Sequence, residues 1–403
     1  MKIVFIEFAG KGGMIHYAYQ LSRALHDLGA DVTLITEKDH YELANLPQPF
    51  RVDRFIETWD PKPSGRLSTS FLAVQFRKVR RIGRAIRYYS EWLRLIRHVR
   101  ALNPDVVLLG DIRFPFDLFP LMLLRRHART FADICHNVRP YESGGGFSNS
   151  KLRQWFYRRI YRLFDVVFVH FERNRAELMA SFGIPHERTG VIVHGNEEIF
   201  RELRTPGVDG AALRKRLGIG ADENVVLFFG TLSHYKGIDV LLQAFPRVHQ
   251  STGARLVLAG YPFHDFDVEA HQALARKLGI EQAVTWVPEY IDSGDVAAWM
   301  ELANVIVFPY RDIYQSGALH VAQTFGVPIV ASSIGAMRDV IEHDTSGFLV
   351  EKENPDALAD ALLRILSDPS VARRLGARAA EDAQGRFSWK SIGKILMSAF
   401  QRS

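Results

Sequence analysis

The chain has 403 residues, of which 47% are hydrophobic and 24% are charged. These fractions exclude extensive disorder and a collagen-like repeat, and the length indicates two or three domains, of which we expect two. The formal net charge of +6 would suit nucleic acid, an anionic membrane or a phosphorylated substrate, and the single cysteine, Cys135, excludes an intrachain disulfide and a cysteine-based zinc site.

The first half of the chain alternates short β-branched runs with helical patterns. The runs do not alternate polar and apolar residues, which is typical of strands buried on both faces of a parallel sheet. They predict strands at residues 3–8, 32–36, 106–110, 130–134, 166–170 and 191–194, with a first crossover helix at 17–28 that stops at Gly29. This pattern predicts an α/β, doubly wound domain.

A glycine-rich loop, with Gly10, Gly12 and Gly13, follows the first strand. Its spacing fits neither a P-loop nor the dinucleotide fingerprint. Adjacent glycines let backbone N–H groups approach an anion at the start of a helix, so we expect an anion site here. A tight turn without a ligand is the alternative.

The positive charge is concentrated between residues 77 and 100, where nine Lys or Arg residues stand against one acid, Glu91. Apolar residues recur there every three or four positions, which predicts an amphipathic helix. We expect this helix to bind an anionic membrane surface, and a solvated face is the bland alternative. Nucleic acid is not an expected partner, because no nucleic-acid fold signature accompanies the patch. The expected membrane contacts are Arg80, Arg81, Arg84, Arg87, Trp92 and Arg94.

Polar residues follow the predicted strands of the first half, at the edge where a parallel sheet places its site. Asp111 is the leading candidate for a general base, and His136 is the second catalytic candidate. The capping of a helix and a satisfied core histidine are the structural alternatives. Further site candidates at this edge are Asn137, Glu142, His170 and Glu172, and residues 194–197 also follow a strand.

A second series of strands begins after residues 204–210, whose Pro and Gly content is typical of a linker. It predicts strands at 225–229, 256–259, 284–287, 305–308, 329–332 and 348–350. The domains are therefore expected at 1–203 and 204–385, with a C-terminal helix at 386–403. The N-terminal apolar run is too short for a signal peptide and no apolar stretch is long enough to span a membrane, so we expect a cytoplasmic protein.

Several ordered motifs together resemble the glycosyltransferase family 4 group. They are Gly12-Gly13 with His16, Phe229-Gly230-Thr231-Leu232 followed by Lys236-Gly237, Phe325-Gly326-Val327-Pro328 with Gly335, and Ser346-Gly347-Phe348-Leu349. The resemblance implies a GT-B fold, in which two Rossmann-like domains face each other across a cleft. It also implies that the second domain holds most of a nucleotide-sugar donor, that the first holds the acceptor, and that the final helix crosses back to the first domain.

The resemblance also assigns roles to single residues. Lys236 would neutralise the donor diphosphate, Gly12 and Gly13 would lie close to the donor, and His136 would lie beside the donor sugar. Tyr290 would pack on the base, with a place in the core as the equal alternative. The acceptor-side candidates are Asn137, Glu142, His170 and Glu172, and Asp111 would contact an acceptor hydroxyl or act as the base. No metal or other cofactor is then required, because fixed cations and N–H dipoles stabilise the leaving diphosphate. The donor would be UDP- or GDP-linked.

The sequence departs from the family at two places. Thr231 stands where many relatives have an arginine, and Ile313 and Val321 stand where many relatives have a pair of glutamates. The turn Gln315-Ser316-Gly317-Ala318 replaces that region, and the N–H groups of Ser316, Gly317 and Ala318 are candidates for diphosphate binding at a helix N-terminus. Asp312 is the nearest carboxylate, as a sugar contact or a solvated loop residue.

We therefore expect a hexosyltransferase that acts on a lipid-linked or polysaccharide-precursor acceptor and that lies peripherally on the inner face of the membrane. The family suggests retention of anomeric configuration. A non-catalytic sugar-nucleotide-binding or partner subunit is the alternative, since the glutamate pair is missing. An epimerase or phosphorylase on the same fold is a weaker third reading.

Overall fold

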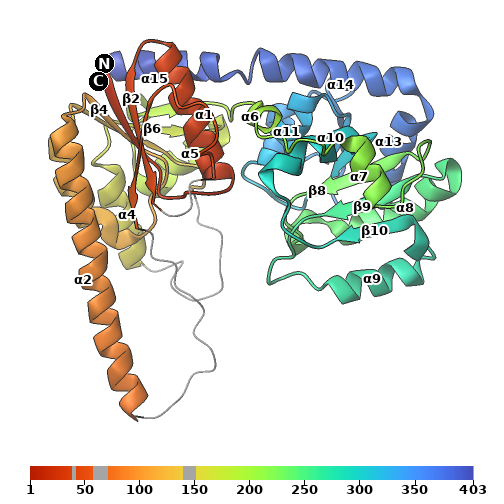
Figure 1. The fold of residues 1–403 in the computed structure, drawn as a ribbon, viewed down its shortest axis with the longest axis horizontal. Coiled ribbons are helices and arrows are strands. Elements are labelled where there is room, and N and C mark those ends of the chain that lie inside the picture. Colours follow the sequence, from red (N-terminus) through yellow and green to blue (C-terminus); the bar gives the residue numbers. More distant parts are fainter. Residues whose placement is uncertain (39–41, 58–70, 139–150, 403) are drawn as a thin grey trace. The chain divides into compact units, whose positions relative to one another are not determined.

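A computed structural model describes residues 1–38, 42–57, 71–138 and 151–402, with only the backbone of residues 71–82. The chain divides into two compact units (Figure 1). Unit 1 comprises residues 1–193 and 392–403, and unit 2 comprises residues 194–391. The expected domain boundary at 203/204 therefore lies ten residues beyond the start of unit 2. Each unit is described by itself below.

Unit 1 is built on a seven-stranded parallel sheet with the order β3-β2-β1-β4-β5-β6-β7. Five predicted strands coincide with observed ones to within two residues, and the sixth overlaps β7 only at Val191. The unpredicted strand is β3, which lies at the sheet edge and carries partly exposed charged residues, so it lacks a continuous apolar run. The strands are β1 (Lys2–Ile6), β2 (Asp31–Glu37), β3 (Arg51–Ile56), β4 (Val106–Leu109), β5 (Thr130–Ile134), β6 (Val166–Val169) and β7 (Thr189–Val191).

Helices pack on both faces of this sheet. One face carries a single core to which α2 (Phe71–Leu102), α3 (Leu118–Leu124), α4 (Lys151–Tyr161) and α5 (Glu172–Phe182) contribute apolar side chains. Phe168 points to the opposite face from its neighbours in β6, and its ring lies 6.0 Å from that of Phe400 in α15 (Trp389–Arg402). The same helix approaches α1 (Gly13–Asp27) closely, because a Cβ on Gly393 would lie 2.9 Å from Leu28 Cδ1.

Unit 2 repeats this architecture with a six-stranded parallel sheet in the order β10-β9-β8-β11-β12-β13. All six strands lie where the apolar runs predicted them, to within one residue. They are β8 (Val225–Phe229), β9 (Arg255–Ala259), β10 (Val284–Val287), β11 (Val305–Phe308), β12 (Ile329–Ser332) and β13 (Phe348–Val350). The helices are α6 (Ile199–Glu202), α7 (Gly210–Arg216), α8 (Ile238–Thr252), α9 (Val268–Lys277), α10 (Val296–Leu302), α11 (Gly317–Phe325), α12 (Gly335–Val340), α13 (Pro355–Ser367) and α14 (Pro369–Gln384).

Residues 194–197, which the sequence placed after a strand as site candidates, fasten the beginning of unit 2 to its last helices. The Asn196 N–H donates to Phe387 O at 2.8 Å, its side chain donates to Ala383 O, and Trp389 Nε1 donates to Asn196 O at 2.7 Å. His194 stacks on His320 with ring centroids 4.7 Å apart, and burial lowers its pKa to about 4. These contacts favour the structural alternative for the segment.

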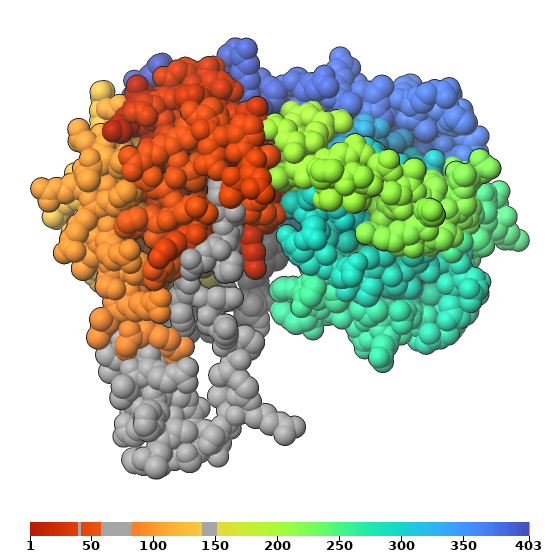
Figure 2. All heavy atoms as spheres, in the orientation of Figure 1, coloured from red at the N-terminus to blue at the C-terminus, as the bar shows by residue number. Residues whose placement is uncertain are grey.

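The basic segment forms the long helix α2, as the periodicity predicted, but its faces differ from the expectation. Trp92 is only 4% exposed and belongs to the core, so its assignment as a membrane contact is wrong. Conversely, Ile86, from the apolar stripe, is 66% exposed. Arg84, Arg87 and Arg94 are exposed, whereas the side chains of Arg80 and Arg81 lie outside the described residues. Figure 2 shows the described part of α2, in orange, on the outside of unit 1.

Within the part of the chain that the structure describes, no helix combines the length and the apolar character needed to cross a bilayer.

Candidate active site

Three of the predicted first-half residues meet in one cavity of unit 1. It has a volume of about 240 Å³ and lies at the carboxyl ends of β4 and β5. Asp111, His136 and Asn137 line it, as predicted. Asp133 and Arg113 also line it, although sequence reasoning did not single them out. Their signal was available, since both lie within three residues of a predicted strand end.

His136 is held by a second histidine. His170 Nδ1 lies 3.1 Å from the carbonyl oxygen of Ile192, which can only accept, so the hydrogen-bond network assigns the proton to Nδ1. In neutral His170, Nε2 then accepts a hydrogen bond from Nδ1–H of His136 at 2.9 Å. Tyr17 packs its ring edge against His136, with centroids 4.8 Å apart. The Nε2 atom of His136 therefore carries the lone pair and is suited to accept from a hydroxyl.

The carboxyl groups near this cavity have raised pKa values. Burial raises the pKa of Asp133 well above its ordinary value, and Asp111 adds to the rise. Asp111 is exposed as a residue, yet the protein packed around its carboxyl still raises its pKa, against the lowering effect of Arg113. A solvent-accessible carboxylate with a raised pKa is a better proton acceptor than an ordinary aspartate. Asp111 therefore remains the best candidate for a general base.

Glu7 is a further buried carboxyl that the sequence did not reveal. Burial raises its pKa to about 8, while a hydrogen bond from the Ala9 N–H, at 2.9 Å, opposes the rise. A Cβ on Gly110 would lie 2.2 Å from Glu7 Oε2, so only a glycine at the end of β4 leaves space for this side chain. Glu7 lies inside the first predicted strand, at residues 3–8, but nothing in the local sequence indicates that its carboxyl is buried against the end of β4.

The glycine loop binds carboxylates of unit 1 itself. The Gly12 N–H donates to Glu42 Oε2 at 2.7 Å and the Gly10 N–H donates to Glu37 Oε2 at 3.2 Å. Gly12 has φ +75°, which favours glycine, and nothing lies within 4 Å of a Cβ placed on Gly12 or Gly13. The expectation of an open anion site therefore needs correction for Gly12, because Glu42 already occupies its N–H, although space remains beside both glycines.

One acceptor-side candidate lies elsewhere, and another is not among the described residues. Glu172 does not line the cavity described above. It lies in the first turn of α5 and forms an ion pair with Arg175 at 2.6 Å, which is a stabilising place for an acid. Glu142 lies outside the described residues.

In unit 2, a buried lysine lies beside the loop that follows β8. Lys236 is 7% exposed, and burial lowers its pKa to about 8. Its Nζ lies 5.1 Å from the ring centroid of Tyr310, and a Cβ on Gly230 would lie 3.2 Å from Nζ and 4.0 Å from Ala318 Cβ. Among the described residues no carboxylate pairs with Lys236. A buried ammonium without a counter-ion is suited to bind an anion.

Glycines keep this loop against the neighbouring strands. Gly237 has φ +64°, and a Cβ there would lie 2.1 Å from Pro309 O. A Cβ on Gly260, which follows β9, would lie 2.0 Å from Gly230 O. Arg311 anchors the same region through two hydrogen bonds to Asp239, at 2.9 and 2.7 Å. The loop is therefore held by backbone packing, which fixes Lys236 in place.

The predicted turn begins α11. Ser316 is its N-cap and accepts from the Leu319 N–H at 3.4 Å, while Gly317 and Ala318 form the first turn. Thr231 and Tyr290 are exposed, Thr231 two residues after β8 and Tyr290 three residues after β10. Ile313 and Val321, at the positions of the missing glutamates, are buried apolar residues and cannot replace carboxylates.

Comparisons with known proteins bear on both units. Residues 11–196 match the family model "Glycosyltransferase Family 4", and residues 223–368 match "Glycosyl transferases group 1". The chain belongs to the glycosyltransferase family 4 group. The family predicted from the motifs is therefore confirmed.

Two curated relatives show how similar this chain is to known proteins of the group. An uncharacterised glycosyltransferase of Methanocaldococcus jannaschii is 26% identical over 56% of this chain and 57% of its own. The D-inositol 3-phosphate glycosyltransferase of Kribbella flavida is 30% identical over 59% of this chain and 56% of its own. The matched region thus spans a little over half the length of these relatives.

The fold has solved counterparts over its whole length. The structure of HepE from Anabaena in complex with UDP and glucose covers 100% of both chains with a TM-score of 0.70, at 19% identity. This likeness confirms the predicted GT-B fold, with two Rossmann-like domains.

Proposed function

We propose that this protein transfers a hexose from a UDP- or GDP-linked donor to a hydroxyl group of a lipid-linked or polysaccharide-precursor acceptor. The observation that carries the proposal is the buried ammonium of Lys236 beside Gly230 and Ala318. Lys236 has no carboxylate partner among the described residues, and it lies near the first turn of α11. This arrangement is suited to bind a diphosphate.

The donor chemistry follows from unit 2. When the bond between the anomeric carbon and the diphosphate oxygen breaks, negative charge grows on the diphosphate. Lys236 and the N–H groups of Gly317 and Ala318 are suited to stabilise that charge, because they are fixed before the reaction begins. Tyr290 is suited to stack on the base, and Thr231 offers a hydroxyl where relatives carry an arginine. This assignment requires no metal ion, which stays a prediction.

The acceptor chemistry follows from unit 1. Asp111 would accept the proton of the acceptor hydroxyl. The oxygen of that hydroxyl would form the new bond to the anomeric carbon. His136 would accept a hydrogen bond from a sugar hydroxyl at Nε2, the atom that its partner His170 leaves with the lone pair. Retention of configuration is the family's usual outcome, and it stays a prediction here.

Relatives support the substrate class. The relative from Kribbella flavida is named for glycosyl transfer to D-inositol 3-phosphate, and the HepE structure contains UDP and glucose. Both names agree with a nucleotide-sugar donor and a hydroxyl acceptor for this chain.

Replacement of Lys236 tests the proposal. Lys236→Met keeps the apolar stem and removes the charge, so release of nucleoside diphosphate should fall at least about tenfold. Lys215→Met, at an exposed position of α7, is the matched control and should leave release unchanged. Equal release by wild type and Lys236→Met, with the fold intact, would contradict the donor assignment.

We further propose that unit 1 docks peripherally on the inner, anionic face of a membrane. Helix α3 packs against both α2 and α4. Exposed apolar side chains on these three helices accompany the arginines of α2. Phe119 is 58% exposed and Trp155 is 47% exposed. Apolar groups beside arginines favour an anionic lipid surface. The exposed apolar residues are Ile86, Tyr89, Leu93, Phe116, Phe119, Met122, Leu123, Leu152 and Trp155.

Sedimentation with vesicles tests this docking. The double variant Phe119→Ser/Leu123→Ser and the charge reversal Arg97→Glu should each reduce binding to vesicles that contain phosphatidylglycerol. Ile395→Ser removes an exposed apolar residue of α15 and serves as the control. Unchanged vesicle binding by both variants would contradict membrane docking through this surface.

A binding-only protein is the second candidate, and the burial of Ile313 and Val321 favours it. Such a protein would be stabilised against heat by UDP or GDP but would release no nucleoside diphosphate from any nucleotide sugar. A thermal-shift screen across nucleotide sugars, followed by a release assay on each stabilising compound, separates the two candidates.

A further inference from the structure

Unit 1 contains a second cavity, separate from the one that Asp111 and His136 line. Its volume is about 160 Å³, and its walls come from β3, α2 and the segments that follow β1 and β4. Trp92 packs on Phe8 with ring centroids 5.4 Å apart and forms one wall. The apolar walls are Phe8, Phe55, Ile56, Trp92, Leu95 and Phe114.

The size of this cavity limits what it can hold. An apolar cavity of about 150 Å³ in a protein interior takes up one benzene ring. The pocket of unit 1 therefore matches one ring or a short alkyl segment. Each methylene group that leaves water for such a site contributes about 0.8 kcal/mol. The walls thus favour an apolar group, and a free sugar would not match them.

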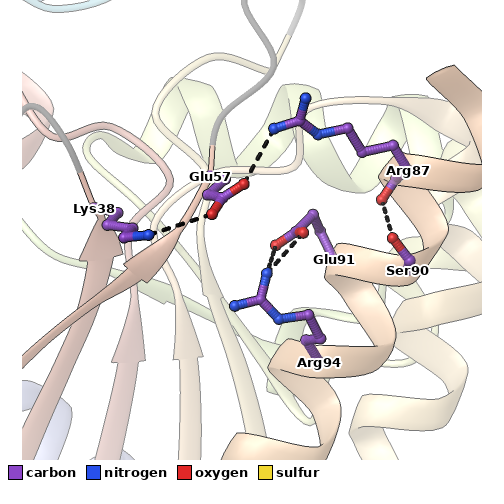
Figure 3. Close-up of polar contacts among 6 residues, drawn as sticks. All are labelled: Lys38, Glu57, Arg87, Ser90, Glu91 and Arg94. Carbon is purple, nitrogen blue, oxygen red and sulfur yellow. Dashed lines mark hydrogen bonds and ion pairs between the residues drawn. The ribbon is translucent and has the colours of Figure 1, made fainter.

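The mouth of the pocket is charged, and its acids are already paired. Glu57 accepts from Arg87 at 3.1 Å and from Lys38 at 3.5 Å. Glu91 accepts from Arg94 at 2.8 and 3.0 Å. Figure 3 shows these pairs, with Glu57 between Lys38 and Arg87 and with Arg94 directed towards Glu91. Three arginines line the pocket against these two acids, so positive charge exceeds negative charge at the mouth: Arg84, Arg87 and Arg113.

Arg113 links this pocket to the polar cavity, because it lines both. Its guanidinium lies 5.8 Å from the Phe8 ring and 5.9 Å from the Phe114 ring. Of the two buried carboxyls near it, Glu7 is a poor counter-ion at neutral pH, since burial raises its pKa to about 8, whereas Asp117, whose pKa burial raises to about 6, is mostly ionised there. Asp117 also accepts hydrogen bonds from the Tyr88 hydroxyl and the Phe114 N–H.

We propose that the acceptor is an anionic amphiphile. Its apolar group enters the pocket between Phe8, Trp92 and Phe114, Arg113 binds its anionic group, and its hydroxyl reaches the cavity of Asp111. This assignment rests on the proposed transfer function, whose acceptor it specifies. An arginine fork matches a phosphate oxygen pair, so a phosphate ester is the chemistry that the site fits best.

Binding of hexyl phosphate, without any nucleotide sugar, tests the assignment. Isothermal titration should show at least tenfold tighter binding of hexyl phosphate than of inorganic phosphate or 1-hexanol. Arg113→Gln and Phe114→Ala should each weaken hexyl phosphate at least fivefold. The control Arg100→Gln, at an exposed position of α2 away from the pocket lining, should have no effect. Thermal unfolding of each variant checks that it folds.

Two arms identify the source of the phosphate. If Arg113→Gln also binds vesicles that contain phosphatidic acid more weakly than wild type does, the phosphate belongs to a lipid headgroup. If only hexyl phosphate loses affinity, it belongs to a soluble acceptor. Hexyl phosphate that binds no tighter than inorganic phosphate, or equally to wild type and Arg113→Gln, would overturn the proposal.

The same titration separates this inference from the proposed function. Lys236→Met should bind hexyl phosphate as wild type does, because Lys236 belongs to unit 2. Donor turnover without hexyl phosphate binding would refute the acceptor assignment alone. Hexyl phosphate binding without any donor turnover would support the pocket and refute the transfer function.

Discussion

The two units share one architecture and treat charge in opposite ways. Unit 2 buries a cation, Lys236, with its pKa lowered to about 8 and no carboxylate partner among the described residues. Unit 1 buries carboxyl groups, among them Glu7 with its pKa raised to about 8, around Arg113. The parallel sheet fixes where a site lies, and the residues at the strand ends decide which chemistry it favours: an anion in unit 2 and proton transfer in unit 1.

The units also differ in what holds their site loops. In unit 2 the backbone of Gly237 packs on the carbonyl oxygen of Pro309, whereas in unit 1 Gly110 leaves space for the side chain of Glu7. A side chain can move to relieve a clash, but a packed backbone cannot do so without displacing the loop. The loop after β8 should therefore tolerate substitution less well than the segment after β4.

The largest expected effect tests that difference. Gly237→Ala should lower the free energy of unfolding by about 3 kcal/mol or more, since it adds a backbone clash to a left-handed φ. Gly110→Ala should cost about 1–2 kcal/mol. Gly253→Ala, with φ +65° and nothing within 4 Å of its Cβ, isolates the cost of the φ alone, about 1 kcal/mol. Equal costs in urea unfolding for Gly237→Ala and Gly253→Ala would disprove the role of backbone packing.

The next prediction concerns proton transfer in unit 1. Asp111→Asn should lower kcat at least about a hundredfold while leaving UDP affinity unchanged, because a base contributes to the transition state and not to donor binding. Glu187→Gln, at an exposed position of the same unit, is the control. A loss of UDP affinity equal to the loss of kcat would move Asp111 from proton transfer to donor binding.

The buried acid of unit 1 should make stability depend on pH. With its pKa at about 8 against an ordinary 4.5, folded Glu7 keeps a proton that the unfolded chain releases above pH 4.5. The free energy of unfolding therefore falls as pH rises from about 4.5 to 8. Glu7→Gln should reduce that fall by about 3 kcal/mol between pH 5 and 7.5, as followed by urea midpoints. An unchanged pH profile in the variant would show that Glu7 is ionised in the folded protein.

The smallest expected effect is the pH dependence of UDP binding through the buried cation of unit 2. A lysine ordinarily has a pKa of 10.5, but burial lowers the pKa of Lys236 to about 8, so its side chain loses its charge near pH 8 in the folded protein. UDP affinity should fall about tenfold between pH 7 and 9, since only the protonated ammonium attracts the diphosphate. Lys236→Arg should bind UDP with little change over this range, because an arginine stays charged. A parallel decline in both proteins would assign the pH effect to another group.

Much of the fold was predictable because its strands are buried on both faces. Continuous apolar runs, such as 225–229 and 305–308, coincide with β8 and β11. The edge strand β3 escaped because half its residues face solvent and carry charge. The ordered glycine motifs predicted the family, since each marks a close backbone approach that few other residues permit.

The candidate site was predictable only in part. Strand ends indicated Asp111 and His136, and the Lys236-Gly237 pair indicated the donor loop. Trp92 was misassigned because helical spacing shows that a helix has an apolar stripe without showing which face the sheet covers. Glu7 was missed because its environment is made by residues distant in sequence, whereas Arg113 was not singled out although it lies close to a predicted strand end.

The amino-acid sequence by itself determined two parallel α/β halves, their strands and the order of their motifs, because burial on both faces and tight glycine turns are local requirements. Only the tertiary structure decided which polar and charged groups are buried away from water. The burial of Lys236 and Glu7, the pairing of His136 with His170, and the pocket beside Trp92 all arise from elements far apart in the chain, and no local pattern records them.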